Sequence, residues 1–189
     1  MGDVEEMNRV EVRASGLGGQ GVVMLGRILA AAAIYQGKEV TQLETYGMQQ
    51  RGGDVRCDVV ISDEEIDYPE VTEADIMILM SQDAFDRHIQ YLKKGGMLIV
   101  DSLLVTRFEV EDKTASIYKI HATEIARVEL GNAMVVNVVM LGAFMGLTGL
   151  LSEDFVQKAI AENVPKKAIE LNLKAFKRGL EEGLKVKGA

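Results

Sequence analysis

A glycine-rich turn near the start of the chain has the residue types needed to hold a phosphate group. It follows an apolar run over residues 10–15, precedes a helical stretch over residues 22–36, and reads Gly16-Leu17-Gly18-Gly19-Gln20-Gly21. In such a strand, turn and helix, glycines let backbone amides approach a ligand closely, and the helix N-terminus favours negative charge. The glycine spacing therefore matches a dinucleotide-binding pattern. Close packing of the strand on the helix is the alternative, which we favour.

A second glycine-containing segment follows the next expected strand and reads Thr45-Tyr46-Gly47-Met48-Gln49-Gln50-Arg51-Gly52-Gly53. It is longer than the usual connection of ~2–6 residues, and such loops often carry function. The guanidinium fork of Arg51 can hold a phosphate, a carboxylate or carbonyl oxygens. A salt bridge to Asp54 or Glu44 is the alternative role. In a dinucleotide site, Glu44 would instead be the acid that binds the ribose.

Alternating strand and helix patterns must position these two loops. Strands are expected at residues 10–15, 39–44, 55–62, 74–80, 97–100 and 116–120. Helices are expected at residues 22–36, 83–92, 123–130, 133–147 and 153–161, and from Pro165 to about Glu182. Asp63-Glu64 predicts a tight turn that pairs residues 55–62 with a short strand at 65–68. Gly95-Gly96 is expected to end a helix, and Ser152 to cap the next-to-last one.

This order predicts an α/β fold, a three-layer Rossmann-like domain with a mostly parallel mixed sheet that includes one antiparallel hairpin. The length of 189 residues favours a single domain over residues 1–189, with a core at about 10–182. Ligands of open α/β sheets bind at the carboxyl ends of the strands. The turns at Gly16, Thr45 and Asp101 are therefore expected on one face of the molecule.

Composition narrows the class of protein. Twenty-nine acidic residues against 21 basic ones give a net charge of -8, which disfavours a nucleic-acid partner. The apolar stretch at residues 133–151 contains Asn137, Thr148 and three glycines, so a buried helix is expected there rather than a membrane span. The acidic start of the chain lacks the features of a signal peptide, and we expect a cytoplasmic protein. Cys57, the only cysteine, is expected to be a small core residue.

Three ordered motifs resemble the gamma subunit of 2-oxoacid:ferredoxin oxidoreductases, which oxidise pyruvate, 2-oxoglutarate and related acids. They are Gly18-Gly19-Gln20-Gly21; Thr45-Tyr46-Gly47 with Arg51-Gly52-Gly53; and Ala122-Thr123-Glu124-Ile125-Ala126 with Gly131-Asn132, Asn137 and Leu141-Gly142. The resemblance covers residues 10–180. One departure is His121, where the family usually has proline; we expect a surface or capping group there.

The resemblance implies an enzyme subunit that is inactive alone. The complex would oxidatively decarboxylate a 2-oxoacid with coenzyme A, giving an acyl-CoA while ferredoxin takes the electrons. Among the 2-oxoacids, the resemblance favours 2-oxoglutarate. Alpha, beta and delta subunits would be the partners and would hold thiamine diphosphate, magnesium and the iron–sulfur clusters. This chain alone would bind no cofactor or metal. A single cysteine and the lack of a Gly-Asp-Gly motif agree with that assignment.

The same resemblance suggests which residues face the active-site cavity or the coenzyme A channel. They are Gly16, Gly18, Gly19, Gln20, Gly21, Thr45, Tyr46, Arg51, Gly52 and Gly53, with Arg51 the strongest candidate. No residue is expected to be catalytic, because the thiamine ylid performs the chemistry. Asn132 and Asn137 are expected to cap a helix and to hydrogen-bond in the interior, and Asp101 to hold a turn. A stand-alone NAD-binding enzyme and a non-catalytic assembly module are the alternatives.

Overall fold

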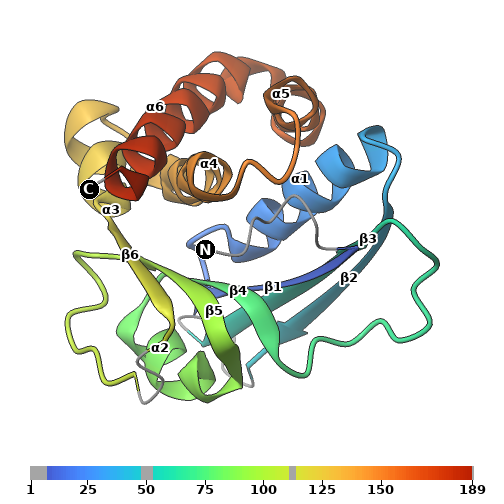
Figure 1. Cartoon of the computed structure of the whole chain (residues 1–189). Coiled ribbons are helices and arrows are strands. Elements are labelled where there is room, and N and C mark those ends of the chain that lie inside the picture. Colours follow the sequence, from blue (N-terminus) through green and yellow to red (C-terminus); the bar gives the residue numbers. More distant parts are fainter. Residues whose placement is uncertain (1–7, 48–52, 111–113, 189) are drawn as a thin grey trace.

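The computed structural model describes residues 8–47, 53–110 and 114–188, and its centre is a six-stranded sheet in the order β2-β3-β1-β4-β5-β6 (Figure 1). The strands are β1 (Arg9–Leu17), β2 (Glu39–Tyr46), β3 (Asp54–Ser62), β4 (Ala74–Leu79), β5 (Leu92–Asp101) and β6 (Ser116–Ile120). β1, β4, β5 and β6 run parallel, and β3 is antiparallel to both of its neighbours. The expected mixed α/β sheet is confirmed.

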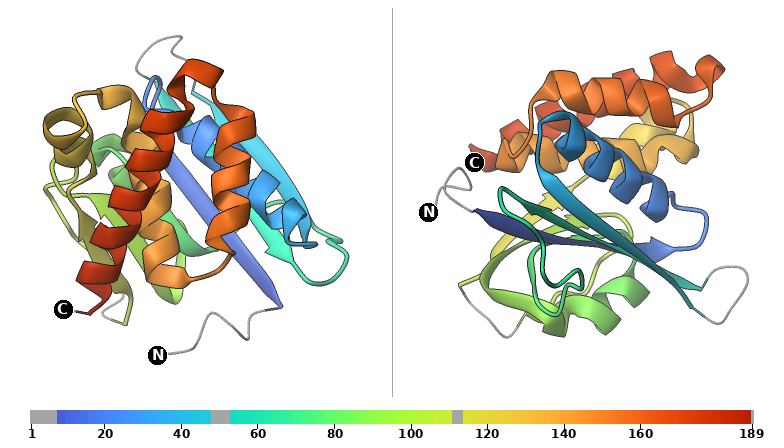
Figure 2. Two further views of the ribbon diagram at one scale, coloured as in Figure 1. Left: turned by 90° about the horizontal axis from the view of Figure 1, so that it is seen from above. Right: turned by 90° about the vertical axis from the view of Figure 1, so that its right-hand side faces the viewer.

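Helices cover both faces of the sheet, which gives three layers. One face carries α1 (Val22–Tyr35), α4 (Val136–Thr148), α5 (Glu153–Asn163) and α6 (Ile169–Lys187), whereas α2 (Gln82–His88) lies on the other. The right-hand view of Figure 2 shows the orange and red helices above the sheet and the green helix below it. Each face buries its own apolar cluster, so β4 and β5 are apolar on both sides.

Burial along β4 and α4 explains their uninterrupted apolar sequences. In β4, Ile76 and Ile78 pack with α1 and α4, while Met77 and Leu79 pack on the side of α2. Every residue of α4 is buried in the protein. The apolar stretch that contains α4 is therefore a core helix, as expected, and among the described residues no helix is long and apolar enough to span a membrane.

The predicted hairpin was wrong. β3 pairs with β2 rather than with residues 65–68, which form no strand. The hairpin loop is therefore the glycine-containing segment that follows Tyr46. The physical reason is that β3 also pairs with β1 along its other edge, so no free edge remains for a strand at 65–68.

Several element ends also differ from the expected ones. Gly95-Gly96 lies inside β5, where a side chain at Gly96 would come within 3.0 Å of the Asp75 carbonyl oxygen, so the pair permits a close strand approach. The expected helix at 83–92 ends at His88 and continues as the 3-10 turn Ile89–Tyr91. Ser152 precedes α5 but makes no side-chain capping bond. The helix expected at 123–130 comprises α3 (Ala122–Glu124) and the π-helical turn η3 (Ile125–Glu129).

Candidate functional site

The two glycine-containing loops meet at the carboxyl edge of the sheet. β1 and β2 both end there, and β3 begins there. The amide of Gly18 donates to the carbonyl of Gly53 across 3.0 Å, and the amide of Gly47 donates to the carbonyl of Asp54 across 2.7 Å. The structure thus brings the described parts of both loops together, with Thr45 and Tyr46 exposed beside them. Arg51 and Gly52 lie outside the described residues.

The side chain of Gln20 closes the glycine turn. Its Oε1 accepts from the amide of Leu17 at 2.6 Å, and its Nε2 donates to the carbonyl of Met80 at 2.8 Å. A Cβ at Gly16 would lie 2.5 Å from that Oε1, so Gly16 makes room for this contact. Gly19 has a φ of 101° with open space beside it. Gly16 and Gln20 therefore shape the turn, whereas Gly18 and Gly19 form its exposed surface.

The third motif packs directly on the first. Asn137, near the start of α4, donates from Nδ2 to the carbonyl of Gly21 at 3.1 Å. Gly21 has a φ of 76°, and a Cβ there would lie 2.6 Å from the same Nδ2, so glycine is required for both reasons. Asn132 accepts from the amide of Met134 at 2.8 Å and caps the turn before α4. Both asparagines have the structural roles that were expected.

Strand order argues against a dinucleotide site. β3 lies between β1 and β2, so Glu44 is two strands, about 10 Å, from the glycine turn. Its carboxylate accepts from Tyr46 Oη at 2.8 Å and from Gln42 Nε2 at 2.9 Å, and Arg27 lies 3.7 Å away. The hydrogen bond with Glu44 raises the pKa of Tyr46. In the dinucleotide-binding fold the ribose-binding acid lies on the strand next to the turn, and Glu44 does not hold that position.

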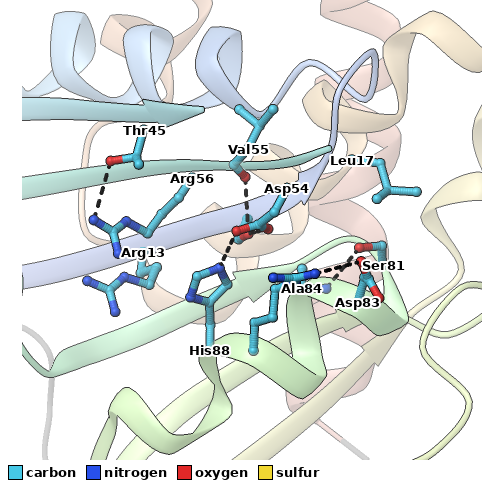
Figure 3. A network of polar contacts seen from close by, with 12 residues as sticks. Arg13, Leu17, Thr45, Asp54, Val55, Arg56, Ser81, Asp83, Ala84 and His88 are labelled. Carbon is cyan, nitrogen blue, oxygen red and sulfur yellow. Dashed lines mark hydrogen bonds and ion pairs between the residues drawn. The ribbon is translucent and has the colours of Figure 1, made fainter. Parts of the chain in front are cut away.

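Asp54 is the first residue of β3, at the loop end of the hairpin, and two side chains from other elements hold its carboxylate (Figure 3). Its Oδ1 accepts from Ser15 Oγ at 2.9 Å, and its Oδ2 accepts from His88 Nε2 at 2.9 Å. Ser15 is fully buried and His88 is 7% exposed. Ser15 contacts the aspartate rather than the histidine, so the three residues do not form a Ser-His relay for nucleophilic attack. They hold the residue that joins the hairpin loop to β3.

Replacing His88 with leucine should destabilise the chain by about 1–2 kcal/mol, because Asp54 loses a hydrogen bond from a mostly buried partner. His88→Gln should recover much of this loss, since its amide can still donate to the carboxylate. Thermal unfolding followed by circular dichroism would measure the difference. The matched control is His121→Leu, whose side chain is 56% exposed in its contact with Glu182. Equal losses for both leucine variants would contradict the proposed support.

A buried ion pair lies next to this support, on the same face of the sheet. Arg13 donates to both carboxylate oxygens of Asp58, at 2.8 and 2.9 Å, and also to the carbonyl of Val71. The Arg13 and Asp58 side chains are 3% and 4% exposed. Arg56 joins the pair with its Nε 3.3 Å from Asp58. Two arginines and Asp58 therefore lie on the α2 face of the sheet, next to Asp54.

Sequence reasoning missed Ser15, His88, Arg13 and Arg56. The alternation of charged residues with valines at the start of β1 was an available sign that this strand has a polar face. Nothing in the sequence indicated which residues that face would meet. Its partners come from β3 and α2, which follow much later in the chain.

Two further predicted roles can be compared with the structure. Asp101 is fully buried and accepts from the amides of Leu103 and Thr123 and from the Thr123 hydroxyl. It holds a turn, as expected. His121 is a surface group, but it makes no capping hydrogen bond; its Nδ1 lies 3.2 Å from a carboxylate oxygen of Glu182. The imidazole therefore contacts Glu182 of α6 and does not cap the start of α3.

Cys57 does not have the environment of a metal ligand or nucleophile. It is fully buried in β3, and burial raises the pKa of its thiol to about 12. A Cβ at Gly26 would lie 2.1 Å from its Sγ, so the thiol fills the space beside that glycine. It is a core residue, as expected. Iron–sulfur clusters are commonly held by four thiolates, and this chain has one cysteine, so its residues do not fit a cluster.

Comparison with known proteins agrees with this set of motifs. Residues 11–182 match the pyruvate ferredoxin/flavodoxin oxidoreductase family. The chain belongs to this family. It is 44% identical over 174 residues to 2-oxoglutarate synthase subunit KorC of Methanocaldococcus jannaschii, covering 92% of this chain and 93% of that subunit. It is 35% identical over 182 residues to pyruvate synthase subunit PorC of the same organism, covering 95% and 99% of the two chains.

A solved member of the family has the same fold. The gamma subunit of the keto/oxoacid ferredoxin oxidoreductase from Geobacter sulfurreducens is 38% identical, with a TM-score of 0.82 over 93% of this chain and 99% of that one. The resemblance inferred from the three motifs is therefore confirmed: this chain is a gamma-type subunit of a multisubunit 2-oxoacid:ferredoxin oxidoreductase. Neither the stand-alone NAD enzyme nor the assembly module is favoured.

Proposed function

We propose that this gamma subunit belongs to a complex that converts 2-oxoglutarate and coenzyme A to succinyl-CoA and carbon dioxide. The electron pair released in the oxidation passes to ferredoxin. The observation that carries the choice of 2-oxoacid is the 44% identity to a 2-oxoglutarate synthase subunit over almost the full length of both chains. Identity to the pyruvate synthase subunit is lower, at 35%.

The proposal places the cofactors in partner alpha, beta and delta subunits. When bound there, thiamine diphosphate supplies the ylid that attacks the 2-oxoacid, and iron–sulfur clusters carry the electrons. The single buried cysteine supports this division. The role proposed for the gamma subunit is to bind and to shape, without a catalytic residue of its own. We also propose that the chain forms a single domain in the cytoplasm.

The carboxyl edge is the surface that we propose to face the active-site cavity or the coenzyme A channel. Exposed Gly18, Gly19, Thr45 and Tyr46 lie there, and the Gly18–Gly53 hydrogen bond joins the two loops. Gly16, Gln20 and Gly21 would contribute by setting the shape of the turn. Arg51 and Gly52 belong to the same proposed surface through their place in the loop.

Purification of the complex from its native host tests the proposal. We expect the chain to co-purify with the proposed partner subunits and to support coenzyme A-dependent reduction of ferredoxin. Turnover should be faster with 2-oxoglutarate than with pyruvate or 2-oxoisovalerate. A chain that purifies alone, with no complex that reduces ferredoxin, would contradict the subunit assignment. A complex that prefers pyruvate would contradict only the proposed substrate.

Arg51→Ala should raise the KM for coenzyme A about tenfold, the effect expected for one charged hydrogen bond. The KM for 2-oxoglutarate should change little, because that substrate reacts at the thiamine cofactor. Steady-state kinetics of the assembled complex would measure both constants. Arg107→Ala is the control, since that side chain is 74% exposed and pairs with Asp86 of α2. An unchanged KM for coenzyme A would remove Arg51 from the proposed site.

A further inference from the structure

Arg56 occupies an unusual position among the charged side chains of the described chain. It is the third residue of β3 and lies opposite Thr45 of β2, so it is close to the loop that joins the two strands. Its side chain points away from α1, to the same face as Arg13 and His88 (Figure 3). Cys57, the next residue, points into the core on the other face. The guanidinium is thus beside the proposed ligand-facing edge.

The buried carboxylate next to Arg56 is already neutralised. Asp58 receives two hydrogen bonds from Arg13, and both of these side chains are almost completely buried. Arg56 approaches the same carboxylate with its Nε at 3.3 Å, and this Nε makes no hydrogen bond within the described chain. Two guanidinium groups therefore share one carboxylate. The neighbouring Asp54 is bonded to Ser15 and His88.

The Arg56 side chain is partly exposed, although its Nε atom is buried. Its side chain is 32% exposed, and its Nη2 donates to the hydroxyl of Thr45 across a long 3.3 Å. Thr45 is itself exposed, as is Leu43 on the same face of β2. Helix α2 packs against β1 and β4. Arg56 and Thr45 are both at least partly exposed, and the contact between them places the guanidinium and the hydroxyl side by side.

We propose that Arg56 and the hydroxyl of Thr45 bind a phosphate group of coenzyme A. The inference rests on the proposed function and adds a specific contact to it. A guanidinium fork donates parallel hydrogen bonds to phosphate oxygens, and a neighbouring hydroxyl can donate another. Because Arg13 already donates two hydrogen bonds to Asp58, that carboxylate competes less strongly with a phosphate for the Arg56 guanidinium. In a chain of net charge -8, the partly exposed Arg56 guanidinium provides the attraction for an anion.

The test compares wild type with Arg56→Gln in the assembled complex, using three acyl acceptors. They are coenzyme A, dephospho-coenzyme A and pantetheine, which differ in the number of phosphates. We expect Arg56→Gln to raise the KM for coenzyme A about tenfold and to leave the KM for pantetheine unchanged. If the rise in KM disappears with dephospho-coenzyme A, Arg56 binds the 3′-phosphate, which that acceptor lacks. If the rise in KM persists, Arg56 binds the diphosphate. Either pattern supports the proposal.

Two variants make the result interpretable. Arg56→Lys keeps the charge but lacks the fork, so its KM for coenzyme A should lie between those of wild type and Arg56→Gln. Arg27→Gln is the matched control, because Arg27 lies near Glu44 on the opposite face of the same hairpin and its side chain is 54% exposed. Its KM for coenzyme A should match that of wild type.

Two outcomes would overturn the inference. One is an unchanged KM for coenzyme A in Arg56→Gln. The other is an equal rise in KM for coenzyme A and for pantetheine, because pantetheine has no phosphate to lose contact with. Failure of the broader proposal would look different. In that case the wild-type complex itself would show no coenzyme A-dependent oxidation of 2-oxoglutarate.

Discussion

Gly179→Ala is expected to destabilise the protein by about 3 kcal/mol or more, because a methyl group has no room where α6 crosses α4. A Cβ at Gly179 would lie 2.1 Å from the carbonyl oxygen of Val139, and one at Gly142 would lie 2.2 Å from that of Phe176. Gly183 and Gly146 are similarly close to the opposite backbone, at 2.3 and 2.5 Å. Since the obstructing atoms are backbone, the two helices would have to separate.

The expected change in the melting temperature of Gly179→Ala is a fall of roughly 6–12 °C, measured by calorimetry or circular dichroism. Gly188→Ala provides the control near the end of α6. The nearest atom to a Cβ there is 3.7 Å away, so this variant should differ from wild type by less than about 0.5 kcal/mol. Similar melting temperatures for the two variants would show that the helices do not cross as closely as described.

Arg13→Met is expected to cost about 3–5 kcal/mol, because it leaves the buried carboxylate of Asp58 without its main partner. Arg56 remains near that carboxylate, but it contributes only a 3.3 Å contact from a partly exposed side chain. The Arg13 guanidinium also lies 5.4 Å from the centre of the Tyr91 ring. Methionine carries no charge, so this cation–π contact would be lost. Chemical denaturation of the chain would measure the loss.

A double variant separates the loss of the pair from the cost of an unpaired charge. Arg13→Met combined with Asp58→Leu removes both charges, so it should cost clearly less than the sum of the two single variants. The control is Arg9→Met, which breaks a pair with Glu11 whose arginine is 33% exposed; it should cost at most about 1 kcal/mol. Additive losses in the double variant would contradict the coupling.

The elements of this fold were largely predictable from local patterns. The apolar runs and the helical periodicity placed all six strands and the main helices, because each signal is contained within a few neighbouring residues. Strand pairing was less predictable. β3 was expected to pair with a short strand after it, yet it lies between β2 and β1. Pairing depends on which edges remain free in the whole sheet, and no local segment contains that information.

The candidate site shows the same division. Gly18, Gly19, Thr45 and Tyr46 could be selected from the sequence because glycine turns and long polar loops have local signatures. Arg56 could not be selected in this way, since it lies within a strand. Only the pairing of Arg56 with Thr45 places it close to the hairpin loop. Sequence patterns also could not show that the Gln20 side chain closes the turn.

The sequence by itself determined the family, because three motifs in a fixed order identify a gamma-type subunit of a 2-oxoacid:ferredoxin oxidoreductase. It also determined that this chain cannot ligate an iron–sulfur cluster with its own thiolates, since it has one cysteine. Only the tertiary structure decided the surroundings of the glycine turn. β3 separates Glu44 from the turn, and Asn137 of α4 packs on Gly21. These contacts join distant segments, and they form because the sheet and helices must bury their apolar faces together.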